Sequence, residues 1–178
     1  MADAKQHITQ GMTPMNAGNA SAAIDHFNLA TQADPSSGQA WYCKGCALTL
    51  LEKHAEAAQC FLQATRVTPT QTAAWFNLGS ALEKLASWKH AVACYETVVR
   101  LNPGDSDAWI NKGRALDEQG LHSEAIADYD RALALAPGDV DAWANRGNSL
   151  KSLGSHDEAL RCYDRALQID PHNAAAMF

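Results

Sequence analysis

The sequence predicts an all-α fold, a solenoid in which antiparallel helix pairs stack on one another. Two observations support this prediction: a 34-residue period without insertions or deletions, and small or helix-ending residues at fixed positions of every period. Counted from residue 4, position 8 is always glycine, position 20 always alanine and position 32 always proline. These residues are Gly11, Gly45, Gly79, Gly113 and Gly147; Ala23, Ala57, Ala91, Ala125 and Ala159; Pro35, Pro69, Pro103, Pro137 and Pro171. One helix pair cannot bury its own apolar face, so stacked copies would share a core.

The period divides the chain into five repeats and the start of another, within a single domain at 1–178. The boundaries are 4–37, 38–71, 72–105, 106–139 and 140–173, with a truncated repeat at 174–178. Repeat one departs most, because His7 replaces a tryptophan and Pro14 falls inside the expected first helix. An interior proline removes a backbone hydrogen bond and clashes with the preceding turn. We expect this helix to be short, kinked or mobile around Gly11 to Pro14, or Thr13 to cap a new short helix that begins at Pro14.

Each repeat is expected to contain two amphipathic helices, shown most clearly by repeat four. Its apolar and small residues recur at three- and four-residue spacing, which is the helical pattern. Gly113 and Ala125 are small where the two helices must approach closely, and Trp109 and Tyr129 would fill the space beside them. Pro137 would end the second helix, because proline cannot continue it.

The pattern of repeat four resembles the tetratricopeptide repeat, a pair of helices with this period. The residues that carry the resemblance are Trp109, Gly113, Leu116, Gly120, Ala125, Tyr129, Ala132 and Pro137. The resemblance covers almost the whole chain and implies a right-handed α-α superhelical solenoid of antiparallel helix pairs. Tryptophans recur at position 4, where we expect them to be buried core residues rather than ligand contacts. They are Trp41, Trp75, Trp109 and Trp143.

Composition and charge argue against several classes of protein. The net charge of −6 and the scattered basic residues do not suit a nucleic-acid partner, which calls for a clustered basic surface. The amino-terminal residues lack the apolar stretch of a secretory signal, and no run approaches the roughly 18 apolar residues of a membrane span. We therefore expect a cytoplasmic protein without membrane insertion, and its five cysteines are expected to be reduced thiols.

The search for catalytic and metal sites finds little. Cys43 and Cys46 have the spacing of a redox pair, but the expected strand-and-helix context is missing. A soft-metal cluster with Met12 and Met15 is conceivable, although cysteines that act as small apolar groups are favoured. The histidines at position 17 are expected in solvated turns, and the carboxylates on solvated helix faces. These histidines are His54, His122 and His156. We expect no catalytic residue, no metal, no cofactor and no enzyme activity.

In the family that this chain resembles, the first helix of each repeat lines a concave groove with its positions 2, 5, 6, 9, 12 and 13, which we call the inner-face positions. An asparagine row at position 6 could pair with the backbone of an extended peptide, because each amide both donates and accepts. The candidate peptide-binding residues are Asn77, Asn111, Asn145, Tyr42, Phe76, Ile110, Arg114, Asn148 and Lys151. The inner-face positions carry no basic set able to hold a terminal carboxylate.

We therefore expect a non-catalytic protein-interaction module that binds an extended peptide or protein segment in the groove. One alternative is a homotypic assembly scaffold that joins copies through uncapped ends, since Leu160, Leu167 and Ile169 would leave the end of repeat five apolar. Another is a chaperone of the type III secretion kind, which fits the size and acidity but not the strict five-repeat register.

Overall fold

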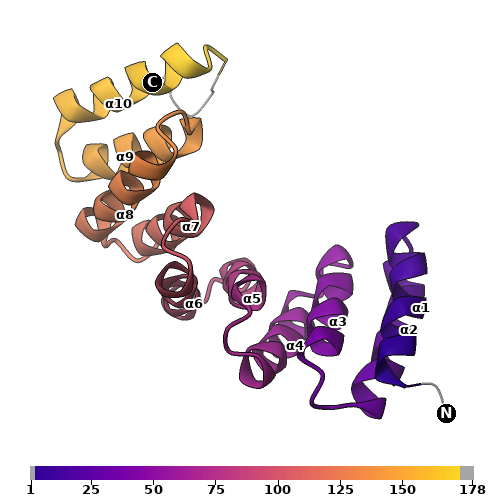
Figure 1. Ribbon diagram of the computed structural model, residues 1–178. Helices are drawn as coiled ribbons and strands as arrows, with labels where there is room; N and C mark the ends of the chain where they lie inside the picture. The colour runs from indigo at the N-terminus through magenta and orange to yellow at the C-terminus, as the bar shows by residue number, and fades with distance from the viewer. Residues whose placement is uncertain (1–2, 173–178) are drawn as a thin grey trace. The chain divides into compact units, whose positions relative to one another are not determined.

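The computed structural model describes residues 3–172 and contains ten α-helices and no strand in that part of the chain. Figure 1 shows most of them in pairs joined by short turns. The pairs are α1 (Ala4–Asn16) with α2 (Ala20–Ala33), α3 (Gly38–Leu50) with α4 (His54–Val67), α7 (Ser106–Asp117) with α8 (His122–Leu135), and α9 (Val140–Ser152) with α10 (His156–Ile169), and between them in the chain come α5 (Thr72–Lys84) and α6 (Trp88–Leu101). The all-α helical-repeat fold predicted from the sequence is thereby confirmed. The proposed repeat start at 174–178 lies outside the described residues.

Side-chain caps fix the starts of four of the five first helices. In each case an oxygen of the residue before the helix accepts a hydrogen bond from the backbone N–H three residues later, which satisfies one of the unpaired donors of a helix start. The capping residues are Asp3, Ser37, Asp105 and Asp139, with distances of 2.8, 3.3, 3.0 and 2.7 Å. These short polar side chains therefore determine where each first helix begins.

The first helices end in the same way in all five repeats. The carbonyl oxygen at position 11 accepts a hydrogen bond from the N–H at position 16, at 2.8 to 3.0 Å, and position 15 adopts a left-handed backbone. Glycine occupies that position in three repeats, but Glu52 and Ala86 occupy it with φ of 57° and 53°. This is the six-to-one bond of a Schellman turn, for which glycine is the preferred residue.

The expectations of a short first helix and of a new helix that begins at Pro14 are wrong, because α1 is a continuous helix of 13 residues, as long as α3 and α5. A kink or mobility around Gly11 to Pro14 stays a prediction. Pro14 lies in the last turn of α1, so its missing N–H affects one bond near the helix end. Its carbonyl oxygen still accepts the closing bond from the N–H of Asn19 at 2.8 Å. Position 11 therefore tolerates proline because its role at the helix end uses the carbonyl and not the N–H.

The glycine at position 8 marks the closest approach of the two helices in a pair, as the sequence predicted. A Cβ added to Gly113 would lie 2.7 Å from Cε1 of Tyr129, and one added to Gly45 would lie 2.6 Å from Cε1 of Phe61. Gly11 and Gly147 meet Phe27 and Tyr163 in the same manner. An aromatic ring at position 24 therefore packs directly on the backbone of the first helix.

The position-4 tryptophans are half-buried, so the prediction of buried core residues is only partly correct. Trp109 and Trp143 pack against the cores of their repeats. Every indole Nε1 also donates a hydrogen bond to the carbonyl oxygen of the proline six residues earlier, at 2.9 to 3.0 Å. The four pairs are Trp41 with Pro35, Trp75 with Pro69, Trp109 with Pro103, and Trp143 with Pro137. The polar ring edge thus holds the turn that joins one repeat to the next.

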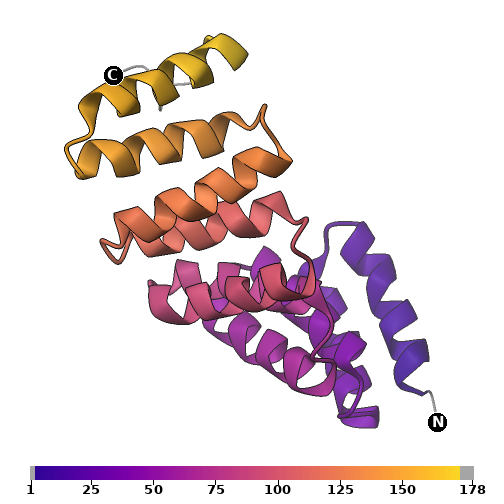
Figure 2. The ribbon, with the colours of Figure 1, turned by 60° about the vertical axis from the view of Figure 1, so that its left-hand side comes forward.

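The helices form two compact units, one up to Ser87 with α1 to α5 and one from Trp88 with α6 to α10. In the first unit Phe27 and Ala47 belong to a buried cluster shared by α2 and α3. Figure 2 shows α7 to α10 of the second unit side by side in chain order, and Tyr129 and Tyr163 lie in the two buried clusters of that unit. No helix in the described part of the chain is both long and apolar enough to cross a membrane.

Candidate functional site

The inner-face positions of the first unit come together around Asn77. Its amide Nδ2 donates to the hydroxyl of Tyr42 at 3.2 Å and lies 3.9 Å from Sγ of Cys46. The Tyr42 ring packs against Phe61 with 5.9 Å between centroids. Burial raises the pKa of Tyr42 to about 12, with Cys46 adding to the shift. Asn77 is half-buried rather than lying on a freely exposed face, and one side of its amide is already engaged within the protein.

A cavity of about 220 Å³ opens beside this cluster. Inner-face positions of α1, α3 and α5 supply most of its wall, and α4 closes it with Phe61. The lining residues are Met15, Cys46, Thr49, Leu50, His54, Phe61, Asn77, Ser80, Ala81 and Lys84. His54 reaches it from the turn side, and its Nδ1 is buried without a hydrogen-bond partner among the described residues. The expectation of a solvated His54 is therefore wrong, since the ring is half-buried against this cavity.

The predicted binding residues of the second unit are not equally accessible. Arg114 donates from Nη1 to Oδ1 of Asn111 at 3.0 Å, and Asn148 accepts from the Tyr163 hydroxyl at 2.8 Å. Asn145 is half-buried and Lys151 is exposed, as is Arg114. Ile110 is only 8 % exposed and belongs to a buried cluster with Tyr129. A ligand on this surface would meet Arg114 and Lys151 before Ile110, which offers little area of its own.

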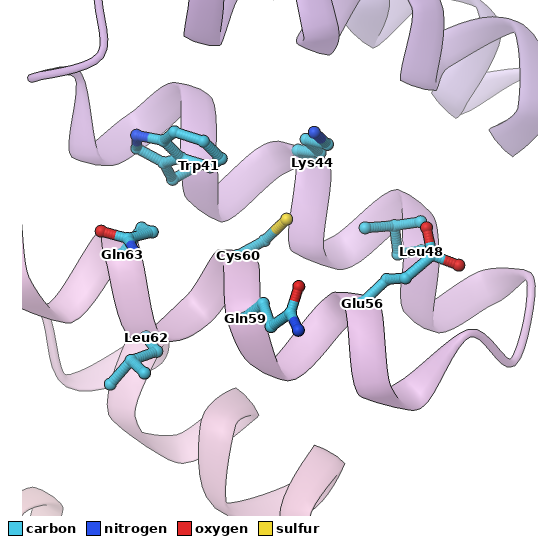
Figure 3. Close-up of a pocket in the computed structure, with 8 residues that line it drawn as sticks. All are labelled: Trp41, Lys44, Leu48, Glu56, Gln59, Cys60, Leu62 and Gln63. Atoms are coloured by element: carbon cyan, nitrogen blue, oxygen red, sulfur yellow. The ribbon is translucent and has the colours of Figure 1, made fainter.

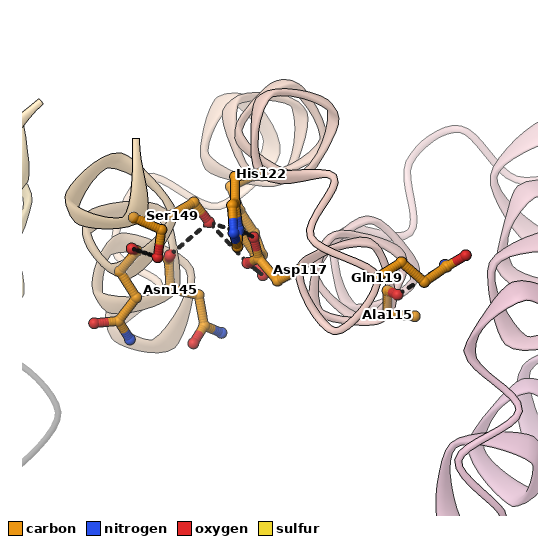
Figure 4. Close-up of polar contacts among 9 residues, drawn as sticks. Ala115, Asp117, Gln119, His122, Asn145 and Ser149 are labelled. Carbon is orange, nitrogen blue, oxygen red and sulfur yellow. Dashed lines mark hydrogen bonds and ion pairs between the residues drawn. The ribbon is translucent and has the colours of Figure 1, made fainter. Parts of the chain in front are cut away.

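A polar cluster of the second unit centres on Asp117, at the end of α7 (Figure 4). Its carboxylate accepts from the Tyr129 hydroxyl at 2.8 Å and from Oγ of Ser149 at 2.7 and 2.9 Å. Nδ1 of His122 lies 2.9 Å from the same carboxylate. Burial, and then the Asp117 charge, raise the pKa of Tyr129 above its ordinary value. The cluster therefore links α7, α8 and α9, and the expectation that His122 is a solvated turn residue is wrong.

The arrangement around Asp117 does not make Ser149 a nucleophile. Serine activation needs an imidazole between the hydroxyl and the carboxylate, so that the imidazole can take the hydroxyl proton. Here the carboxylate lies between His122 and Ser149, and both groups bond to it. Ser149 is also 1 % exposed, so a substrate could not reach its hydroxyl. The chemistry of this cluster is that of a structural hydrogen-bond network.

The thiols are free, and four of the five are buried. Burial raises the pKa of Cys43, Cys46 and Cys60, and it raises the pKa of Cys94 to about 12. A thiol with a raised pKa is a poor nucleophile and a poor metal ligand at neutral pH, because the thiolate is the reactive form. Among residues 3–172, no three histidine, cysteine or acidic side chains gather in a way that could hold a metal ion.

Ion pairs connect successive helix pairs of the second unit. Nζ of Lys112 lies 2.6 Å from the carboxylate of Glu96 and 3.2 Å from that of Asp128. Asp128 is 6 % exposed, which corrects the expectation that carboxylates lie on solvated faces. Arg146 donates to Asp130 at 2.7 Å and to Sγ of Cys162 at 3.0 Å. Position 7 of these two repeats therefore carries a cation that is bound from two other helices.

Sequence reasoning missed these networks, although the residue types left a partial signal. Ser149 carries a hydroxyl at position 10, which is alanine in repeats two to four. Lys112 and Arg146 both stand at position 7, and in each case the preceding repeat has an acidic residue at position 25. The sequence alone did not show that these residues face one another. The period placed them on helices, but it did not show which side chains meet, and partners such as Glu96, Asp130 and Ser149 lie in a neighbouring repeat.

Comparison with known proteins identifies the repeat. The tetratricopeptide-repeat family matches residues 8–66, 44–89 and 76–140, and a second description of the same repeat matches residues 140–173. An uncharacterized protein from Methanocaldococcus jannaschii is 32 % identical over 60 residues, which is 34 % of this chain and 70 % of that protein.

Solved structures of similar fold cover almost the whole chain. YrrB, described as a tetratricopeptide-repeat protein with an unusual peptide-binding site, is 26 % identical with a TM-score of 0.91, over 98 % of this chain and 90 % of that one. MamA from residue 41 to its end, from Desulfovibrio magneticus RS-1, has a TM-score of 0.89 at 20 % identity, over 96 % and 97 % of the two chains. The latter likeness shows the fold alone. Proteins of this family are generally interaction modules without catalytic activity, and the fold supports protein partners. Together the family matches cover residues 8–173, and the chain belongs to the tetratricopeptide-repeat family.

Proposed function

We propose that the inner-face positions bind an extended segment of a protein partner, without catalysing a reaction on it. The observation that carries the proposal is the cavity of about 220 Å³ between α3 and α5, whose walls combine apolar side chains with one amide. Drug-sized ligands usually occupy pockets of roughly 300 to 1,000 Å³, so this cavity suits a single side chain. A partner segment that crosses the first helices could place one apolar side chain there.

The polar groups around the cavity suit a peptide backbone. The Ser80 hydroxyl can donate and accept, whereas the Thr49 hydroxyl donates to the Gly45 carbonyl oxygen at 3.0 Å and offers its oxygen as an acceptor. The Asn77 amide is held in place by Tyr42. A side chain that is already oriented loses less conformational freedom on binding, which favours affinity. In the second unit the exposed inner-face residues include acidic side chains as well as Arg114 and Lys151, and together they would favour a polar, partly basic ligand. The acidic residues are Asp107, Glu118 and Asp141. YrrB, a relative at 26 % identity, is described as having a peptide-binding site, which supports a peptide as the ligand class.

The experiment compares two exposed leucines of the first unit. Leu50 is 60 % exposed and lines the cavity, whereas Leu85 is 45 % exposed and does not line it. Each is changed to Glu, and partners are captured from the native host and quantified by mass spectrometry. We expect Leu50→Glu to reduce the amount of captured partner at least tenfold, and Leu85→Glu to leave it nearly unchanged. Equal recovery with both variants would place the binding site elsewhere on the chain.

A second candidate function, assembly of copies of this chain, is favoured by one exposed side chain. Position 21 of a second helix normally packs against the following repeat, as Val92 and Ile126 do in the second unit. Leu160 holds that position in α10 and is 53 % exposed, and Leu167 and Ile169 on the same helix are half-buried. A second copy that covers this helix would remove that apolar surface from water.

Light scattering from micromolar to millimolar concentration tests the assembly. We expect a rising mean mass for the wild type and a constant monomer mass for Leu160→Glu. A monomer of the wild type throughout this range would exclude assembly through α10, and it would leave the proposal for the inner-face positions untouched.

A further inference from the structure

A second pocket, of about 300 Å³, lies between α3 and α4 and shares no residue with the inner-face cavity. Figure 3 shows Trp41, Lys44 and Leu48 of α3 on one side, and Cys60 with Gln59 and Gln63 of α4 on the other. Nζ of Lys44 lies 5.5 Å from the centre of the Trp41 ring. Among the described residues no carboxylate lies within ion-pair distance of Lys44. The pocket thus combines a cation, an aromatic face and two amides.

The chain itself shows what a cation at this position binds. In repeat four Lys112 occupies the same position 7 and also lies over the ring of the position-4 tryptophan, at 5.2 Å. Its ammonium group binds Glu96, at position 25 of the preceding repeat, and Asp128, at position 23 of its own. In repeat five Arg146 binds Asp130, again at position 25 of the repeat before. Both later repeats therefore supply the position-7 cation with a carboxylate.

Repeat two has the cation but lacks both carboxylates. Asn28 holds position 25 of repeat one, and Cys60 holds position 23 of repeat two. Lys44 is close enough to Cys60 to lower the pKa of the thiol, but burial has the larger effect and raises it, so Cys60 stays neutral. In repeat three both positions are apolar: Leu78 stands at position 7, and Leu62 stands at position 25 of the repeat before. Lys44 is thus the one position-7 cation among the described residues that has a neutral residue at position 25 of the preceding repeat and at position 23 of its own.

Glu56 also lines the pocket, and its charge must be compatible with an anion there. Its carboxylate pairs with Lys53 at 3.4 Å. The same position 19 is Glu124 in repeat four and Glu158 in repeat five, where the internal carboxylates bind their cations nevertheless. An acidic residue at position 19 is therefore part of the arrangement that accepts a carboxylate.

From this comparison within the chain, we propose that the Lys44 pocket binds an aspartate or glutamate side chain of a partner protein segment. The carboxylate would pair with Lys44 from the open side of the pocket, next to Cys60, which stands where Asp128 pairs with Lys112 in repeat four. Amide N–H groups of Gln59 and Gln63 line the pocket and can donate to the same carboxylate. Leu62 on the pocket wall is 38 % exposed and gives an apolar neighbour of the acidic residue a surface to contact. This apolar surface is the reason for a protein segment rather than a free carboxylate ion.

The test uses ¹⁵N-labelled protein and three probes. The first is an acetylated and amidated peptide, Ala-Leu-Glu-Leu-Ala; the second carries Gln in place of Glu; and the third is glutarate. The indole N–H signal of Trp41 reports occupancy, and Trp41→Phe assigns it. We expect the Glu peptide to shift this signal with saturation at millimolar or lower concentration, and to bind at least tenfold more tightly than the Gln peptide and glutarate. Equal binding of the Gln peptide, equal binding of glutarate, or no shift with the Glu peptide would each overturn the proposal.

Four variants connect the shift to Lys44. Lys44→Met should weaken the Glu peptide at least tenfold, whereas Lys44→Arg should retain binding. Lys89→Met, which changes an exposed lysine that does not line the pocket, should bind as the wild type does. Asn28→Asp should supply the missing internal carboxylate and exclude the peptide. Circular dichroism shows that each variant is folded, and unchanged peptide binding by folded Lys44→Met or Asn28→Asp would contradict the proposal.

Discussion

Repeats two and four build the same framework and use its variable positions differently. Both pair a glycine with an aromatic ring, place a tryptophan over the preceding turn, and carry a lysine at position 7. In repeat four Lys112 is fully engaged by carboxylates, whereas Lys44 in repeat two borders an open pocket. The period thus determines the helices and their closest approach, and a few positions decide whether a repeat strengthens itself or leaves groups available to a partner.

The largest effect is expected from removing the position-7 lysine of repeat four. Lys112→Met leaves Asp128 buried beside no cation, and breaking a buried pair on one side costs roughly 3 to 5 kcal/mol. Lys44→Met breaks no ion pair and should cost under about 1 kcal/mol, mainly the contact with the Trp41 ring. Urea unfolding followed by circular dichroism measures both free energies. Adding Asp128→Leu to Lys112→Met is the control, and it should recover most of the loss. Equal losses in the two lysine variants would show that the ion pairs of repeat four do not stabilise it.

The next effect concerns the glycine that packs on the aromatic ring. In both repeats an added Cβ would clash with the ring, and overpacking of this kind costs roughly 1 to 3 kcal/mol. We expect Gly113→Ala to lie at the upper end, because the hydroxyl of Tyr129 is held by Asp117 at 2.8 Å. Gly45→Ala should cost less, because Phe61 has no hydroxyl and borders the inner-face cavity, into which the ring can shift.

Thermal and urea unfolding of the two alanine variants test this order. The Tyr129→Phe background is the sharper control: it releases the ring from Asp117, so the added cost of Gly113→Ala should then approach that of Gly45→Ala. A larger loss for Gly45→Ala than for Gly113→Ala in the wild-type background would contradict the role of the hydroxyl.

A smaller effect is expected where the first helix ends, and the change in stability has opposite signs in the two repeats. Position 15 is left-handed in both repeats, with Glu52 at φ 57° and Gly120 at φ 75°. A residue with a Cβ is strained there by roughly 1 to 2 kcal/mol, so Glu52→Gly should stabilise by about 1 kcal/mol. Gly120→Ala should destabilise by a similar amount, and a Cβ at Gly120 meets nothing within 4 Å, so that loss would report backbone strain alone. Melting temperatures that move in the same direction for both variants would refute this account.

The features that the sequence predicted correctly are those set within one helix pair. The period placed Gly113 against Tyr129, and it gave the all-α fold and the turns. The Schellman bond explains why the expectation for Pro14 failed, since no sequence pattern showed that position 11 contributes through its carbonyl. The tryptophans were placed correctly as structural residues, but their bonds to the preceding turn were not anticipated.

The candidate site was much less predictable, because its contacts join different repeats. Asn77 bonds to Tyr42 across 35 residues, and Asp117 bonds to Ser149 across 32. Such contacts depend on side-chain rotamers in two helices and on how far apart the helices lie, which periodicity does not give. Asn77, Asn111 and Asn145 form one row in the sequence, yet in the structure each has different neighbours. Their part in binding remains a prediction.

The smallest expected effect is a pH dependence of stability, which Asp128 at position 23 of repeat four should show and Cys60 at position 23 of repeat two should not. Burial raises the pKa of Asp128 above its ordinary value, and Lys112 opposes this only in part. The folded state therefore binds a proton more readily than the unfolded chain, whose aspartate pKa is about 3.9. Protonation of Asp128 therefore adds to the stability of the folded state as the pH falls from the folded to the unfolded pKa. This contribution is lost as the pH rises through the folded pKa. Unfolding free energies from pH 7 to pH 4 should thus favour the wild type over Asp128→Asn increasingly toward acid.

Cys60 at the same position is a neutral thiol throughout this range, so the difference between the wild type and Cys60→Ser should not change. A wild type that loses stability relative to Asp128→Asn on acidification would mean that Lys112, and not burial, dominates the environment of Asp128.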